Sequence, residues 1–64
     1  MSEQIRELQK NGIYKFQGMS REESRKAALK LAGAAFMEDR KNGIECQYGT
    51  ARDVFGYYAA VVIN

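Results

Sequence analysis

The spacing of apolar and polar positions divides the chain into two helix-like and three strand-like segments. The phrase Lys-Asn-Gly-Ile occurs at 10–13 and again at 41–44, each time between a helix-like and a strand-like segment. A cation near the last helical carbonyls, followed by an Asn-Gly pair and a β-branched residue, is typical of a helix that ends and leads into a strand. The sequence therefore predicts helices over 2–10 and 20–41, and strands over 13–17, 44–48 and 54–63.

The two predicted helices differ in length and in how they begin. In the short one, Ser2 is the expected N-cap, and Ile5 and Leu8 share a face that must dock because so short a helix is marginal alone. In the long one, Ser20 and Glu23 have the spacing of a capping box. Its inner arc is rich in alanine, which lets the axis lie close to a sheet, with larger residues at the margins. The residues of this arc are Ser24, Ala28, Leu29, Leu31, Ala32, Ala35 and Phe36.

The three predicted strands differ in how many of their faces are apolar. In 13–17, Tyr14 and Phe16 share a face and should point to the core, and in 44–48 a single apolar face includes Cys46. The segment 49–53 is expected to be a turn. The last strand, 54–63, is apolar on both faces, which is typical of a central strand. We therefore expect it between the other two, antiparallel to both.

The predicted fold class is α+β, with the element order α-β-α-β-β and a three-stranded antiparallel or mixed sheet packed on one long amphipathic helix. This arrangement covers one face of the sheet and leaves the other open. That second face could receive the short helix, a second copy of the chain, or a different protein.

Length and charge limit the interpretation further. The 64 residues form one small domain, 1–64, and a domain of this size buries only about 60% of the surface that its unfolded chain exposes. Ten Lys and Arg against eight Asp and Glu leave a net charge of +2, which does not by itself indicate nucleic-acid binding. The polar start and the lack of a long apolar run favour a soluble, cytoplasmic protein with no membrane partner.

The residues that usually carry chemistry are scarce. Without histidine, neither a Ser-His-Asp nor a Cys-His arrangement can form, and Cys46 fits a small core residue better than a reactive thiol. The glycines lack the spacing of a phosphate-binding loop, and the usual zinc ligand sets are missing. We therefore expect no catalytic, cofactor-binding or metal-binding residues, no cofactor and no enzymatic activity.

A surplus of aromatic strand residues without catalytic chemistry favours a small non-enzymatic protein–protein interaction module. Phage-type inhibitors that bind and block a host protein have this size, so inhibition is the form of this function that we expect by analogy. The expected partner is another protein, a second copy of the chain in a homodimer, or both. The candidate interface residues are Ile13, Lys15, Tyr48, Phe55, Tyr57 and Tyr58.

An alternative is a small, dimeric nucleic-acid-binding protein that uses the basic outer helix face or the sheet aromatics. The run 55–58, Phe-Gly-Tyr-Tyr, is similar to the aromatic part of the RNA-recognition-motif consensus, but Asp53 and Val54 stand where that motif has a basic residue and glycine. The chain is also too short for the complete motif, so this similarity identifies no family. The candidate nucleic-acid contacts are Lys26, Lys30, Arg40 and Lys41.

Overall fold

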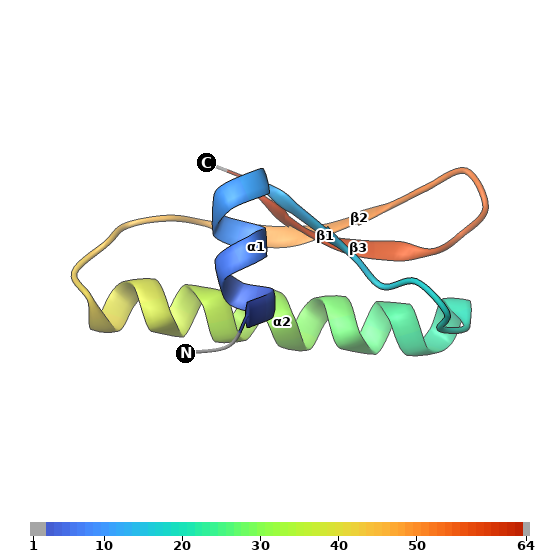
Figure 1. The fold of residues 1–64 in the computed structure, drawn as a ribbon, viewed down its shortest axis with the longest axis horizontal. Coiled ribbons are helices and arrows are strands. Elements are labelled where there is room, and N and C mark those ends of the chain that lie inside the picture. Colours follow the sequence, from blue (N-terminus) through green and yellow to red (C-terminus); the bar gives the residue numbers. More distant parts are fainter. Residues whose placement is uncertain (1–2, 64) are drawn as a thin grey trace.

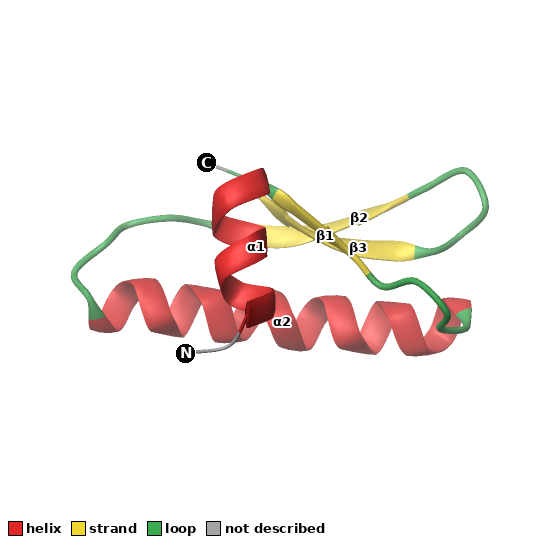
Figure 2. Cartoon of the chain, in the orientation of Figure 1, coloured by secondary structure: helices red, strands yellow, loops and turns green. Residues whose placement is uncertain are grey.

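A computed structural model describes residues 3–63, which form two helices and a three-stranded sheet (Figures 1 and 2). The strand order is β1-β3-β2, and β3 is antiparallel to both neighbours, so the predicted α+β class and the central C-terminal strand are confirmed. Within the described range, neither helix is long and apolar enough to cross a membrane. The predicted N-cap Ser2 lies outside the described residues. The elements are α1 Glu3–Asn11, β1 Ile13–Lys15, α2 Arg21–Lys41, β2 Tyr48–Arg52 and β3 Tyr58–Val62.

The ends of the helices follow the local sequence signals. The Ser20 hydroxyl accepts a hydrogen bond from the Glu23 backbone N–H at 3.2 Å, and the Glu23 carboxylate accepts one from the Ser20 N–H at 3.1 Å, which confirms the capping box. The bond from the Ser20 backbone N–H to the carboxylate is the main cause that lowers the pKa of Glu23, and the Ser20 side chain lowers it further. In the two Lys-Asn-Gly-Ile phrases, Gly12 and Gly43 have φ angles of 79° and 75°, the left-handed backbone expected there.

The core lies on one side of the sheet only. Ala60, at the centre of β3, is fully buried on the side of the sheet that faces the helices. On this side α2 packs along β2 and β3, and α1 packs against β1 and α2. The short helix α1 therefore docks through Ile5 and Leu8 on the same side as α2, and it does not cover the second face. Of the α2 arc, Leu29 and Phe36 stay exposed outside the core. The buried cluster is Ile5, Leu8, Phe16, Ala28, Leu31, Ala35 and Ala60.

The prediction of a strand over 44–48 is wrong, because β2 begins only at Tyr48. The 21 residues of α2 extend for about 31 Å, well beyond the end of the sheet, so the chain must return along the helix before it can pair (Figure 1). Residues 44–47 make this return as a connection. Cys46 is therefore half-buried in a connecting segment and not a core residue.

The predicted turn at 49–53 and the predicted strand over 54–63 are also displaced. Residues 49–52 belong to β2, and a side chain at Gly49 would place its Cβ 2.5 Å from Cδ1 of Ile63, so the exposed Ile63 side chain would have to shift to accept it. The turn lies instead at 53–57, closed by a hydrogen bond of 3.1 Å from the Gly56 N–H to the Asp53 carbonyl. Strand β1 is likewise shorter than predicted and ends at Lys15.

Candidate functional site

The sheet face turned away from both helices is formed by alternate residues of the three strands. Because Tyr14 and Ala60 pair and contribute to the core side, their neighbours along each strand face the other way. No element of residues 3–63 packs over this surface, which we call the open face. Its members are Ile13, Lys15, Gly49, Ala51, Ala59 and Val61.

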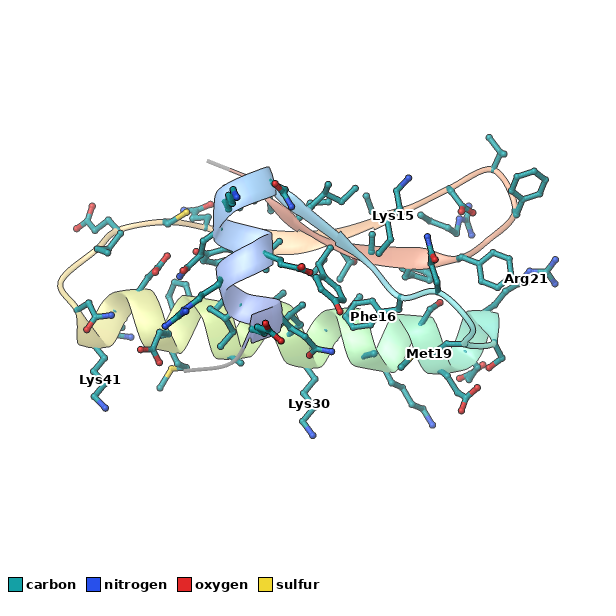
Figure 3. The ribbon with its side chains drawn as sticks, in the orientation of Figure 1. Lys15, Phe16, Met19, Arg21, Lys30 and Lys41 are labelled. Carbon is teal, nitrogen blue, oxygen red and sulfur yellow. The ribbon has the colours of Figure 1, made fainter. Side chains whose placement is uncertain are left out.

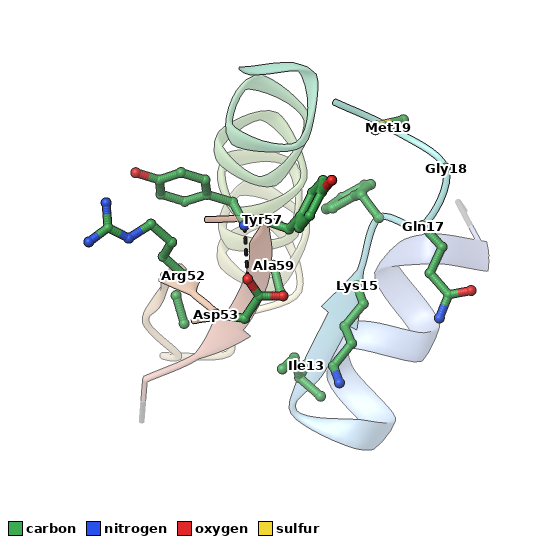
Figure 4. A pocket seen from close by; sticks show the side chains of 12 residues that line it. Ile13, Lys15, Gln17, Gly18, Met19, Arg52, Asp53, Tyr57 and Ala59 are labelled. Carbon is green, nitrogen blue, oxygen red and sulfur yellow. Dashed lines mark hydrogen bonds between the residues drawn. The ribbon is translucent and has the colours of Figure 1, made fainter. Parts of the chain in front are cut away.

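A groove of about 550 Å³ lies where the open face meets the β2–β3 hairpin. Figure 4 shows Lys15 and Gln17 on its β1 side and Arg52 and Asp53 on its β2 side. Ala59 lies between the two sides. The groove is thus apolar at its base and includes Lys15 and Arg52 among its lining residues, with the Arg52 guanidinium pointing away from Lys15 in Figure 4.

The turn beside this groove presents two apolar side chains to solvent. Val54 is 92% exposed and Phe55 is 69% exposed. The carboxylate of Asp53 accepts hydrogen bonds of 2.9 Å from the backbone N–H groups of both Phe55 and Tyr57, and these bonds order the turn; Figure 4 shows the bond from Tyr57. We call Val54 and Phe55 the hairpin tip.

Arg21, the first residue of α2, holds the hairpin from outside. Its Nε donates a hydrogen bond of 2.6 Å to the Phe55 carbonyl, and its guanidinium carbon lies 5.6 Å from the centre of the Tyr57 ring. One turn later, the buried Ser24 hydroxyl accepts a hydrogen bond of 3.0 Å from the Tyr58 N–H. The N-terminal end of α2 therefore fixes the position of the tip relative to the groove.

The structure gathers most of the predicted interface residues around this groove. Ile13, Lys15, Tyr57 and Tyr58 all line it, and Phe55 lies beside it at the tip. Sequence reasoning missed other members of the same site, although the Asp-x-x-Gly spacing at 53–56 is a turn signal that could have placed the tip. The missed residues are Met19, Arg52, Asp53 and Val54.

Tyr48, the remaining predicted interface residue, lies at the other end of the sheet. Its hydroxyl donates a hydrogen bond to the carboxylate of the buried Asp39, which also accepts one of 2.7 Å from the Gln9 side chain. Burial raises the pKa of Tyr48, and the bond to Asp39 raises it further. These bonds join α1, α2 and β2 beside a second cavity of about 420 Å³, so Tyr48 stabilises the fold.

The predicted nucleic-acid contacts do not form one cluster. Lys26, Lys30 and Lys41 are exposed on the outer face of α2, and Figure 3 shows Lys30 and Lys41 pointing away from the sheet. Arg40 is rotated by about 100° from Lys41 and lies on the flank of the helix. Met37, which is 63% exposed, interrupts the lysines.

Two further findings concern the chemistry and the relatives of this site. Among residues 3–63, no three His, Cys, Asp or Glu side chains come together as a metal site would require. Comparisons of the chain with protein-family models, with curated proteins and with solved structures find no significant match.

Proposed function

We propose that this protein is a non-enzymatic interaction module that binds another protein through the hairpin tip and the adjacent groove. The observation that carries the proposal is the tip itself, in which Val54 and Phe55 are exposed although the turn beneath them is held by Asp53 and Arg21. A turn that only connects two strands does not require two exposed apolar side chains. An exposed apolar group on a fixed turn is suited to insertion into a pocket of a partner.

The expected energetics support this role. Burying a Val or Phe side chain in a partner contributes about 1.5–3 kcal/mol each. Because Asp53 and Arg21 already order the turn, little conformational entropy is left to lose on binding. The tip can thus contribute a large share of the affinity of a small interface.

The charges around the groove indicate the chemistry of the partner. Lys15 and Arg52 are among the groove-lining residues, and Oδ1 of the nearby Asp53 carboxylate accepts hydrogen bonds from two backbone N–H groups of its own turn. The complementary surface is an apolar pocket with acidic residues at its rim. A partner of this kind could be blocked by the bound module, in the manner of a phage-type inhibitor, and loss of the partner's activity on binding is the consequence to assay.

The test compares three forms of the chain as bait in a native extract, followed by titration of the purified captured protein. The forms are wild type, the double variant Val54→Ser with Phe55→Ser, and the control Met37→Ser, which changes an apolar residue on the far side of α2 that is about as exposed as Phe55. We expect saturable binding by wild type and control, and at least a tenfold weaker affinity for the tip variant. Equal affinity of all three forms would overturn the proposal.

The charge of the partner is tested with Lys15→Glu. We expect this variant to bind more slowly, and the difference from wild type to shrink as salt is raised, because the charges at a rim act mainly by steering. The alternative, nucleic-acid binding, predicts instead that the chain retains an oligonucleotide at about 50 mM salt and loses it in the double variant Lys26→Glu with Lys30→Glu.

A further inference from the structure

The outer edge of β2 has unpaired backbone groups. Gln47 accepts a hydrogen bond from Ile63, and Asp53 donates one to Tyr57, so the odd-numbered positions of this strand bond to β3. The N–H and C=O groups of the even-numbered positions point the other way, and no described strand pairs with them. Such an edge is a template for another strand. The residues concerned are Tyr48, Thr50 and Arg52.

The flank of α2 on the same side as this edge is apolar. Ala27 and Leu31 pack in the cluster that contains Ile5 and Leu8 of α1, and α1 packs against β1, so the opposite flank of α2 lies on the β2 side. Leu29 and Phe36, seven residues apart and hence on one stripe, project from that flank and are 55% and 40% exposed. An unpaired strand edge and an exposed helix stripe therefore form one continuous side of the molecule.

Gly33 lies between these two residues in the middle of the helix. A side chain at this position would meet no atom of the chain within 4 Å, so packing within one copy does not require glycine here. Glycine nevertheless costs about 1 kcal/mol relative to alanine inside a helix. A close approach by a second helix would account for it.

The strand edge and the helix stripe share a centre. Asp39 bonds to Tyr48 near one end of β2, and Ser24 bonds to Tyr58, the partner of Arg52, at the other end. Thr50 is the middle residue of β2, so the part of α2 beneath it lies halfway between residues 24 and 39, at residues 31–32. The midpoint of Leu29 and Phe36 falls at 32–33, within one residue of it.

We propose that two copies of this chain pair through antiparallel β2 strands about a two-fold axis at Thr50, forming a six-stranded sheet. The axis then places Leu29 of one copy against Phe36 of the second copy, with Gly33 at the helix crossing. Strands spaced by about 4.8 Å would bring the two α2 helices to about 10 Å, a normal packing distance. At the end of the stripe, Glu22 and Arg25 of one copy lie near Arg40 of the second copy.

The size of the required interface is compatible with this side of the molecule. A stable interface commonly buries about 800 Å² on each partner, roughly a sixth of the 4828 Å² of accessible surface of this chain. Pairing of this kind covers one unprotected sheet edge and the two largest apolar side chains of the flank. It uses the β2 edge and the α2 flank and not the side chains of the hairpin tip, so it does not rest on the proposed function, although Arg52 belongs to both the paired edge and the groove lining.

The test is the mass in solution by sedimentation equilibrium over a range of concentrations, for wild type, Leu29→Glu with Phe36→Glu, and the control Met37→Glu. We expect wild type and control to approach twice 7.3 kDa and the double variant to stay at 7.3 kDa with unchanged circular dichroism. A wild type that stays at 7.3 kDa up to about millimolar concentration, or a double variant that associates as wild type does, would overturn the proposal.

If the double variant fails to fold, amide hydrogen exchange of the wild type tests the same strand pairing independently. The N–H groups of Thr50 and Arg52, which point away from β3, should become protected as the concentration rises. Exchange of these two groups that is fast and independent of concentration contradicts the pairing. The tip variant Val54→Ser with Phe55→Ser should keep the wild-type mass, which separates this result from the test of partner binding.

Discussion

The two sides of strand β3 carry similar residues and have different surroundings. On the core side, Ala60 is fully buried and the half-buried Val62 packs against the buried cluster, whereas on the other side Ala59 is buried, Val61 is half-buried and Ile63 is exposed. The difference arises because both helices dock on the same side, the short one through its Ile5 and Leu8. An apolar strand face shows that a surface can be covered, but the placement of the helices decides whether the same chain covers it.

The largest effect should come from removing a side chain on the covered side. Leu8 is completely buried, so Leu8→Ala should cost about 2–5 kcal/mol of unfolding free energy, measured by urea denaturation. Ile63→Ala, a similar truncation on the open side, should cost less than about 1 kcal/mol. Equal losses would show that the two sides are packed alike.

A smaller loss should follow from Tyr48→Phe, which removes the bond between β2 and the buried Asp39 and should cost about 1–3 kcal/mol at neutral pH. Because folding raises the pKa of Tyr48, its contribution is present below the ordinary tyrosine pKa of about 10 and is lost as pH rises above it. The stability difference between wild type and variant should therefore shrink in urea titrations above about pH 10. A constant difference would contradict this role.

The helix cap should give a weaker, acid-dependent effect. Since folding lowers the pKa of Glu23, its contribution is present above the ordinary glutamate pKa and is lost as pH falls through the lowered value. Glu23→Gln should be less stable than wild type at neutral pH, and the two should converge in acid once the pH has fallen through the lowered pKa. The neighbouring Glu22→Gln, outside the capping box, serves as the control in the same urea titrations.

The sequence was sufficient for the features that depend on local residues. The capping box, the two helix ends at Gly12 and Gly43, and the docking of Phe16 each follow from residues close together in the chain. The strand boundaries after α2 were predicted wrongly, because they depend on how far the helix extends past the sheet. That distance is set by tertiary packing and cannot be read from the alternation at 44–48.

The candidate site was predictable in part for the same reason. The alternation of β1 predicts that Ile13 and Lys15 lie on the face opposite the core, where the structure has them. Phe55, in contrast, is predicted in a strand and lies in a turn. Its apolar neighbours had suggested a buried strand over 54–63. The Asp53 and Gly56 signals, together with the contact from Arg21, override that pattern and turn Val54 and Phe55 outward.

The central claim is that the side chains of the hairpin tip take no part in holding the fold together, and urea denaturation of the double variant Val54→Ser with Phe55→Ser tests it most directly. If the tip is a surface kept for a partner, the free energy of unfolding should stay within about 0.5 kcal/mol of wild type. A loss approaching that of Leu8→Ala would show that the two side chains stabilise the domain, and would contradict the account.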